Sequence, residues 1–141
     1  MKIKDIMSKD VICCDINDSI KDVCNIMKKY DVGFIVVYDN NKVCGCLTDR
    51  DIVLNYGNEI KDIISSNLIT IKPSDTLRFA AEVMGENKIK RVIVMDKEDA
   101  CGVVSLSDLI RYINCYEEIK KIYSIDRNDE YQEVSVDDFE L

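Results

Sequence analysis

The hydrophobic positions of the chain follow two different periods, and the same order of periods occurs twice. Short apolar runs, VICC at 11–14 and LITI at 68–71, predict strands. The stretches that follow place apolar residues at i, i+3, i+4 and i+7, which predicts a helix with one apolar face. The residues of these two faces are Ile20, Val23, Cys24 and Met27, and Leu77, Ala80, Ala81 and Met84.

Two β-rich runs then flank a turn in each half, DNNK in the first and DKED in the second, which predicts a hairpin. Each half is therefore expected to be strand, helix, strand, strand, helix, preceded by a short helical turn at IKDI. Asp18 and Asp75 stand where the N-cap of the first long helix is expected. In the second half the last helix is expected to be longer, because apolar residues continue at near-helical spacing through Ile113 and Tyr116.

The two halves align without a gap. GCLTDRD (45–51) matches GVVSLSD (102–108) at an offset of 102 − 45 = 57, and the same offset places IKDIMS (3–8) on IKDIIS (60–65). An ungapped tandem repeat predicts two copies of one supersecondary unit, each too small to bury its own core. The predicted organisation is a first repeat at 1–57, a second at 58–115, and a C-terminal helix extension with an acidic tail at 116–141.

Charge and hydropathy exclude several classes of partner. The net charge is −8 over 141 residues, and the last sixteen residues (126–141) hold seven acids against one Arg. A chain of this sign lacks the basic stripe that DNA or RNA requires. No apolar run reaches the length of a membrane span, and the N-terminal sequence is too polar for a secretory signal, so a cytoplasmic protein without membrane contact is expected.

The side-chain inventory argues against catalysis. There is no histidine, which excludes triads of the Ser-His or Cys-His kind. The seven cysteines contain no CxxC spacing, so neither a metal site nor a disulfide framework is expected, and most of them fall in apolar runs where a reduced Cys acts as a small hydrophobe. Thiol-based redox sensing remains an alternative, through Cys13, Cys14, Cys44 and Cys46.

A hydroxyl residue and an acid stand three positions apart at the start of each final helix, Thr48 with Asp51 and Ser105 with Asp108. This spacing is a capping box, which needs no ligand. The same groups also suit a nucleotide, because a helix start and a hydroxyl bind phosphate and a carboxylate binds the two hydroxyls of a ribose. The glycine that opens each motif predicts a close backbone approach. Both interpretations stay open on the residues alone.

The doubled G-h-h-[ST]-x-x-D pattern, in which h is an apolar residue, resembles a tandem pair of CBS domains, the Bateman module, of the stand-alone bacterial type. The resemblance covers about residues 1–115. It implies two pseudo-symmetric copies packed through their sheets, with clefts between the copies that bind AMP, ADP, ATP, S-adenosylmethionine or sometimes NAD. Such a module is a regulatory sensor with no catalytic residue, no metal and no cofactor.

The resemblance also assigns residues to two clefts. One cleft is expected to contain Asp108, Ser105, Ser107, Arg91, Val32, Gly33, Asp18 and Val23. The other is expected to contain Asp51, Thr48, Arg50, Ile89, Lys90, Asp75 and Ala80. The two acids would bind ribose, and Arg91 would bind phosphate. Phe34 stands at the position equivalent to Arg91 in the first copy, so phosphorylated ligands are expected mainly at the Asp108 cleft unless Arg50 or Lys90 substitutes.

The function predicted from these features is a homodimeric sensor of adenosine-containing ligands that signals to a partner protein. Three alternatives remain: an interaction or scaffold module with empty clefts and the acidic tail as its binding element, an enzyme accessory subunit, and the thiol-based redox sensor.

Overall fold

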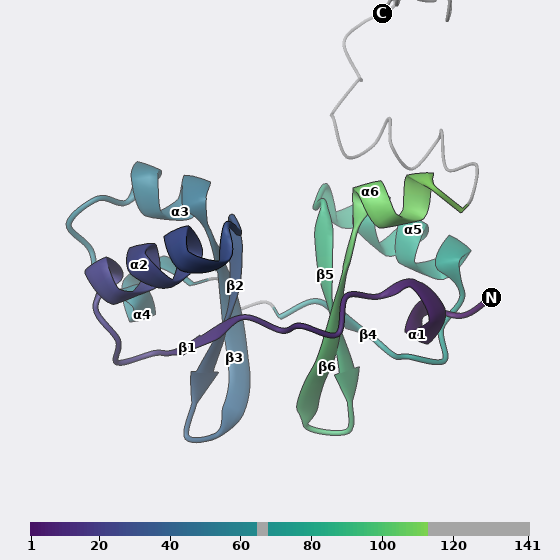
Figure 1. Cartoon of the computed structure of the whole chain (residues 1–141), viewed down its shortest axis with the longest axis horizontal. Coiled ribbons are helices and arrows are strands. Elements are labelled where there is room, and N and C mark those ends of the chain that lie inside the picture. The colour runs from purple at the N-terminus through teal and green to yellow at the C-terminus, as the bar shows by residue number, and fades with distance from the viewer. Residues whose placement is uncertain (65–67, 113–141) are drawn as a thin grey trace, which may run out of the picture.

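The computed structural model describes residues 1–64 and 68–112, so the predicted extension of the last helix and the acidic tail lie outside the described residues. The chain forms two three-stranded sheets, each with helices on one side (Figure 1). In chain order the elements are α1 (Ile3–Ile6), β1 (Cys13–Asp15), α2 (Ile20–Tyr30), β2 (Phe34–Asp39), β3 (Lys42–Thr48), α3 (Asp49–Leu54), α4 (Ile60–Ile63), β4 (Thr70–Ile71), α5 (Leu77–Asn87), β5 (Arg91–Asp96), β6 (Asp99–Ser105) and α6 (Leu106–Ile110).

Both sheets contain the predicted strands and hairpin, and the structure adds the pairing of the first strand. In each, the first strand pairs in parallel with the second and the second pairs in antiparallel fashion with the third, in the orders β1-β2-β3 and β4-β5-β6. The β2–β3 turn places Asn40 and Asn41 at positive φ, which Asn tolerates better than most residues. The mixed α/β fold and its two hairpins are therefore confirmed.

The caps of the two long helices differ from the prediction. The N-caps are Ser19 and Thr76, whose hydroxyls accept bonds from backbone N–H groups three residues later at 3.0 and 3.1 Å. Asp18 and Asp75 stand one residue earlier, and their carboxylates accept the N–H of the residue three positions before them, at 2.9 and 2.7 Å. Each acid thus closes the turn that leads into the helix, and the hydroxyl residue begins it.

The apolar face of α5 is confirmed, whereas that of α2 is displaced from the predicted one. All four predicted positions of α5 are buried, and this helix packs beside α6 in one core. On α2, Val23 and Met27 are buried, Ile20 is half-buried and Cys24 is exposed. The prediction for Cys24 is therefore wrong, because Ile26 packs against the first core on the other side of the stripe and Cys24 is turned to solvent.

The two copies exchange their first helical turns. The N–H of Ile3 donates to the Asp75 carbonyl at 3.0 Å, and Ile3 is fully buried in the core of the second sheet. Ile60 of α4 is buried in the core of the first sheet in the same way. We call β1–β3 with α2, α3 and α4 the first unit, and β4–β6 with α5, α6 and α1 the second unit. Figure 1 shows α1 beside the second sheet and α4 beside the first.

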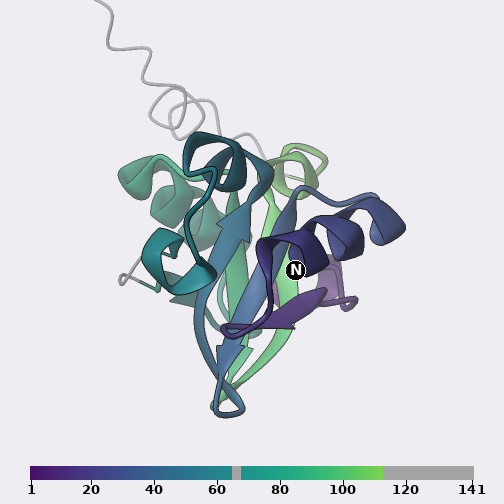
Figure 2. The ribbon, with the colours of Figure 1, turned by 90° about the vertical axis from the view of Figure 1, so that its left-hand side faces the viewer.

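The two sheets pack face to face, as predicted. Ile35 and Val37 of β2 point into the helix-side core, so Val36 between them points to the other sheet, and it has no exposed surface. Ile93 of β5 is 2% exposed and occupies the same position in the second unit. β3 and β6 contact each other across the interface. The sheets form the middle of the molecule and the helices its outer sides (Figures 1 and 2).

None of the helices in residues 1–64 and 68–112 is long and apolar enough to cross a membrane.

Candidate functional site

The doubled motif forms a capping box in both units. Ser105 is the N-cap of α6: its hydroxyl accepts the Asp108 N–H at 3.1 Å, and Asp108 Oδ2 accepts the Ser105 N–H at 2.8 Å. Thr48 and Asp51 make the same pair of bonds at the start of α3, at 3.0 and 2.9 Å. The helix-start interpretation of the motif is therefore confirmed.

Capping uses only part of each carboxylate. The bond to the Ser105 N–H involves Oδ2 of Asp108, and Oδ1 has no hydrogen-bond partner within the described residues. Asp108 is half-buried, so this second oxygen lies in a partly desolvated position where a bond to a ligand hydroxyl is favourable. Ser107, the variable residue before the acid, is exposed, and its hydroxyl pairs with that of Ser105 at 2.8 Å.

A cleft of about 320 Å³ opens in front of Asp108. Its walls come from both units and from the segment that joins α1 to β1. They consist of Ser8, Asp10, Ile12, Asp31, Val32, Gly33, Phe34, Arg91, Val103, Ser105 and Asp108. The structure therefore brings Asp108, Ser105, Arg91, Val32 and Gly33 together, as predicted for this cleft. We call this the Asp108 cleft.

Two contacts predicted for this cleft, Val23 and Asp18, lie elsewhere, and so does Ala80, which was predicted for the Asp51 cleft. Val23 and Ala80 are fully buried in the first and second cores, so neither offers surface to a ligand in a cleft. Asp18 is bonded to the Asp15 N–H in the turn before α2 and is not among the lining residues. The starts of the long helices face their own cores, because these helices cover the outer sides of the sheets.

The place expected for the helix start is taken by the segment from Ser8 to Ile12, which the sequence analysis missed. Ser8 and Val103 exchange backbone hydrogen bonds at 2.9 and 3.0 Å, and the Ile12 carbonyl accepts the Val36 N–H at 3.0 Å. The segment thus runs from β6 of the second unit to β2 of the first. Its only sequence signal was that the polar residues Ser8, Lys9 and Asp10 follow the first IKDI turn. No pattern showed that this turn packs on the second sheet.

The predicted close backbone approach at Gly102 is confirmed. A Cβ at this position would lie 2.9 Å from the Ser8 carbonyl oxygen, closer than side chains tolerate. Glycine therefore allows the segment from Ser8 to cross β6 and to place Ser8 at the cleft.

Val32 and Gly33 reach the cleft through the end of α2. Asp31 adopts the left-handed conformation at the C-cap, with φ of 52°, and the Val32 N–H donates to the Met27 carbonyl at 3.0 Å. The Gly33 carbonyl then accepts the Asp49 N–H at 3.0 Å. A Cβ on Gly33 would lie 2.8 Å from Asp49 Oδ2, so this wall of the cleft is bare backbone beside a carboxylate.

Arg91 and Phe34, which are equivalent in the repeat, meet in space. The Arg91 guanidinium carbon lies 6.0 Å from the centroid of the Phe34 ring, within range of a cation–π contact. Both residues line the Asp108 cleft. The prediction assigned the ring to the Asp51 cleft, and this placement corrects it: the starts of β2 and β5 adjoin where the sheets face each other, so Phe34 serves the Asp108 cleft as well.

The predicted Asp51 cleft is only partly described. Ile89 and Lys90 follow α5, and the Lys90 carbonyl accepts the Leu106 N–H at 2.8 Å, the counterpart of the Gly33 bond. Arg50 is exposed on α3, beside Asp51. At an offset of 57, the segment equivalent to Ser8–Ile12 is 65–69, and residues 65–67 lie outside the described ones. Apart from Ala80, which is fully buried, the assignments to this cleft therefore stay predictions.

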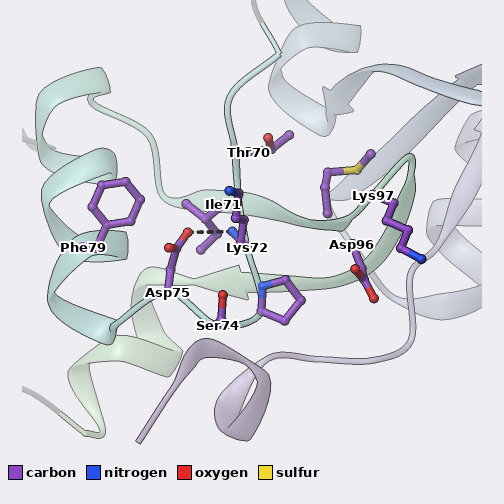
Figure 3. Close-up of a pocket in the computed structure, with 10 residues that line it drawn as sticks. Thr70, Ile71, Lys72, Ser74, Asp75, Phe79, Asp96 and Lys97 are labelled. Carbon is purple, nitrogen blue, oxygen red and sulfur yellow. Dashed lines mark hydrogen bonds between the residues drawn. The ribbon is translucent and has the colours of Figure 1, made fainter.

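A second pocket, of about 610 Å³, lies within the second unit (Figure 3). It is formed by the loop from β4 to α5 and the β5–β6 turn, and its lining includes Lys72, Asp75, Phe79, Asp96 and Lys97. The Asp75 carboxylate accepts the Lys72 N–H there, as the dashed line in Figure 3 shows. Asp75 thus belongs to a pocket of one unit that contains no residue of the repeated motif.

The thiols of the described cysteines are free. Burial raises the pKa of Cys14 to about 12, with Asp18 adding to the shift, and burial followed by Asp51 raises the pKa of Cys46. Burial also raises the pKa of Cys44. A raised pKa leaves little thiolate, the reactive form, so three of the four cysteines of the redox alternative are poorly suited to it. Among the described residues no group of three or more His, Cys, Asp or Glu could hold a metal ion.

Two structurally equivalent units that share a cleft define a paired-repeat module, and comparison with known sequences specifies the family. The sequence model of the CBS domain matches residues 3–57 and 60–115. The chain therefore belongs to the CBS domain family and carries two CBS domains in tandem, as the resemblance of the motif implied.

Individual members of the family are similar to this chain in sequence or in structure. It is 31% identical over 114 residues to the CBS domain-containing protein YhcV of Bacillus subtilis, covering 76% of this chain and 81% of that protein. It is 26% identical to inosine-5'-monophosphate dehydrogenase of Methanocaldococcus jannaschii, but it spans only 23% of that enzyme. The CBS domain pair of protein MJ0100, solved in complex with 5'-methylthioadenosine and S-adenosyl-L-methionine, superposes with a TM-score of 0.73 at 27% identity, covering 79% of this chain and 94% of that one.

Proposed function

We propose that this CBS pair is a regulatory module that binds an adenosine-containing ligand in the Asp108 cleft and signals its occupancy to a protein partner. One observation carries the proposal: residues of both units line the cleft, around a half-buried carboxylate whose Oδ1 has no partner within the described residues. Asp108 binds the ribose hydroxyls in this proposal, and Ile12, Val32 and Phe34 provide apolar surface for the adenine.

The composition of the cleft also suggests how occupancy is transmitted. A ligand in it contacts Asp31–Phe34 of the first unit, Ser105 and Asp108 of the second, and the Ser8–Ile12 segment between them. Binding therefore ties the two units together and selects one relative arrangement of them. A partner that contacts both units senses this arrangement. The solved complex of the CBS pair of MJ0100 with adenosyl compounds supports the ligand class.

Thermal unfolding of the protein with adenosine, AMP, ATP, 5'-methylthioadenosine and S-adenosylmethionine tests the proposal. A ligand at ~100 times its dissociation constant stabilises the native state by about 2.7 kcal/mol and raises the melting temperature by several degrees. Asp108→Asn should reduce the shift strongly, because Asn retains the shape and a cap acceptor but loses the charge. Asp99→Asn, which changes an exposed carboxylate at the start of β6 that lines neither pocket, should leave the shift intact.

The result that would overturn the proposal is an absence of any shift at millimolar concentration of every compound. An Asp108→Asn variant that responds like the parent would also contradict it, because binding would then occur elsewhere. The absence of any shift would favour an interaction module, for which the exposed apolar residues Val53 and Leu54, 73% and 68% exposed at the end of α3, are the specific observation. A parent-like Asp108→Asn variant would instead move the ligand site away from the Asp108 cleft.

A further inference from the structure

The charged residues that line the Asp108 cleft are mostly acidic. Three carboxylates, Asp10, Asp31 and Asp108, line it together with a single cation, Arg91, which gives a formal sum of −3 + 1 = −2. Asp49 adds a fourth carboxylate against the backbone of Gly33. Two of these acids, Asp10 and Asp31, had no part in the prediction from the sequence.

These charges are available to a ligand. Within the described residues the one ion pair joins Lys61 to Glu59, so no Lys or Arg neutralises Asp10 or Asp31 at contact distance. Arg91 lies over the Phe34 ring and forms no ion pair with either acid. The cleft thus presents one guanidinium and two unpaired acids, besides the acid that the proposed function assigns to the ribose.

Such a set opposes a polyphosphate chain. A triphosphate beside Arg91 would bring several negative charges into a cleft of about 320 Å³ that already holds three carboxylates. At this scale the charges are closer than the Debye length of about 8 Å at physiological salt, so solvent ions screen them incompletely. One guanidinium forms a bidentate pair of hydrogen bonds with a single anionic group. The remaining phosphates would then lie close to the carboxylates of the cleft and be repelled by them.

The same set complements a zwitterionic amino-acid tail on an adenosyl group. A tail of this kind has one carboxylate, which the Arg91 guanidinium binds in a fork, and one ammonium, which suits Asp10 or Asp31. In S-adenosylmethionine a sulfonium carries a further positive charge next to the ribose. We propose that the Asp108 cleft selects an adenosyl amino acid of the S-adenosylmethionine type over adenine nucleotides, and this inference rests on the proposed function.

The test is calorimetric titration of the full chain with four compounds. S-adenosylmethionine has the charged tail, 5'-methylthioadenosine has the same sulfur-linked nucleoside without it, and AMP and ATP carry one and three phosphates. We expect S-adenosylmethionine to bind most tightly and ATP at least roughly tenfold more weakly, a difference of about 1.4 kcal/mol. Raising the salt concentration should narrow the difference.

Variants separate the contribution of the tail from that of the nucleoside. The double variant Asp10→Asn with Asp31→Asn should bind S-adenosylmethionine roughly tenfold more weakly than the parent and ATP more tightly. Its affinity for 5'-methylthioadenosine should be unchanged. Asp99→Asn, at an exposed acid that lines neither pocket, serves as the matched control, and the melting temperature of each unliganded variant checks that it folds. The neutral compound keeps the test valid, because a variant with a damaged cleft would lose affinity for it too.

The outcomes distinguish this inference from the proposed function. AMP or ATP binding more tightly than S-adenosylmethionine would overturn the inference and leave the proposed function standing. Equal losses for S-adenosylmethionine and 5'-methylthioadenosine in the Asp10 and Asp31 variants would overturn it as well. If none of the four compounds binds, both fail together.

Discussion

At the scale of single residues, Asp108 and Asp51 have the same structural role, and only their proposed ligand roles differ. Each carboxylate accepts the backbone N–H of its N-cap residue. Asp108→Ala and Asp51→Ala should therefore each lower the free energy of unfolding by about 1 kcal/mol, the usual value of a capping interaction. For an adenosyl ligand, Asp108→Ala should weaken binding roughly tenfold or more, and Asp51→Ala should weaken it less.

Chemical denaturation and calorimetry of the two variants measure these effects separately. Because the stability losses are matched, a larger loss of affinity at Asp108 cannot come from helix fraying. Equal losses of affinity would show that the two clefts are equivalent and that the choice of the Asp108 cleft was wrong.

The second prediction at this scale concerns Arg91. Its guanidinium lies over the Phe34 ring in an exposed position, where a cation–π contact contributes about 0.5–1 kcal/mol. Arg91→Ala should thus affect the free energy of unfolding little. The variant should bind AMP and S-adenosylmethionine roughly tenfold more weakly, since both ligands present an anionic group to the guanidinium. Unphosphorylated adenosine should bind as before, because Asp108 still holds the ribose.

Arg78→Ala on α5 is the control for the removal of an exposed arginine. Parent-like affinity of Arg91→Ala for both charged ligands would place the anion-binding group elsewhere, with Arg50 and Lys90 as the next candidates.

At the scale of elements, the exchanged helical turns make a matched pair. Ile3 of α1 and Ile60 of α4 are both buried, in the second and the first core respectively. Ile3→Ala and Ile60→Ala should each cost about 2–5 kcal/mol of unfolding free energy, as other large-to-small substitutions in cores do. Because the two sites lie in separate cores, the losses should add to within about 0.5 kcal/mol in the double variant.

Urea denaturation of the two single variants and the double variant checks this expectation. An Ile3→Ala variant as stable as the parent would mean that α1 does not dock on the second unit in solution. That outcome would also remove the path by which the Ser8–Ile12 segment reaches the cleft.

The exchange explains which features could be predicted from the sequence and which could not. The strands, hairpins and capping boxes depend on local patterns, and the 57-residue offset duplicated each pattern, so these predictions were reliable. The placement of Ser8, Asp10 and Ile12 depends on which sheet α1 joins, and no periodicity encodes that choice. Helix starts were assigned to the cleft in their place, and Val23 proved to be a core residue.

At the scale of the whole molecule, the helices lie on the outer sides of the two facing sheets, and they leave apolar side chains in solvent (Figure 1). Val53 and Leu54 on α3, and Ile110 at the end of α6, are more than half exposed. Ile113 and Tyr116, on the predicted extension of the last helix, were expected to contribute to the dimer contact with Ile110, and they lie outside the described residues. A second copy of the chain, related by a twofold axis, is the occupant we expect, because a closed pair covers equivalent patches at once.

Leu54→Glu combined with Ile110→Glu should convert this dimer to a monomer, since a pair of copies would bury four carboxylates without partners. Light scattering at ~50 μM protein measures the mass, and association must be judged at a fixed concentration because it follows mass action. Lys42→Glu, in the β2–β3 hairpin, controls for the added negative charge. If the parent chain is itself monomeric at this concentration, signalling through a dimer is excluded, and the exposed residues of α3 and α6 remain as the surface for a different protein partner.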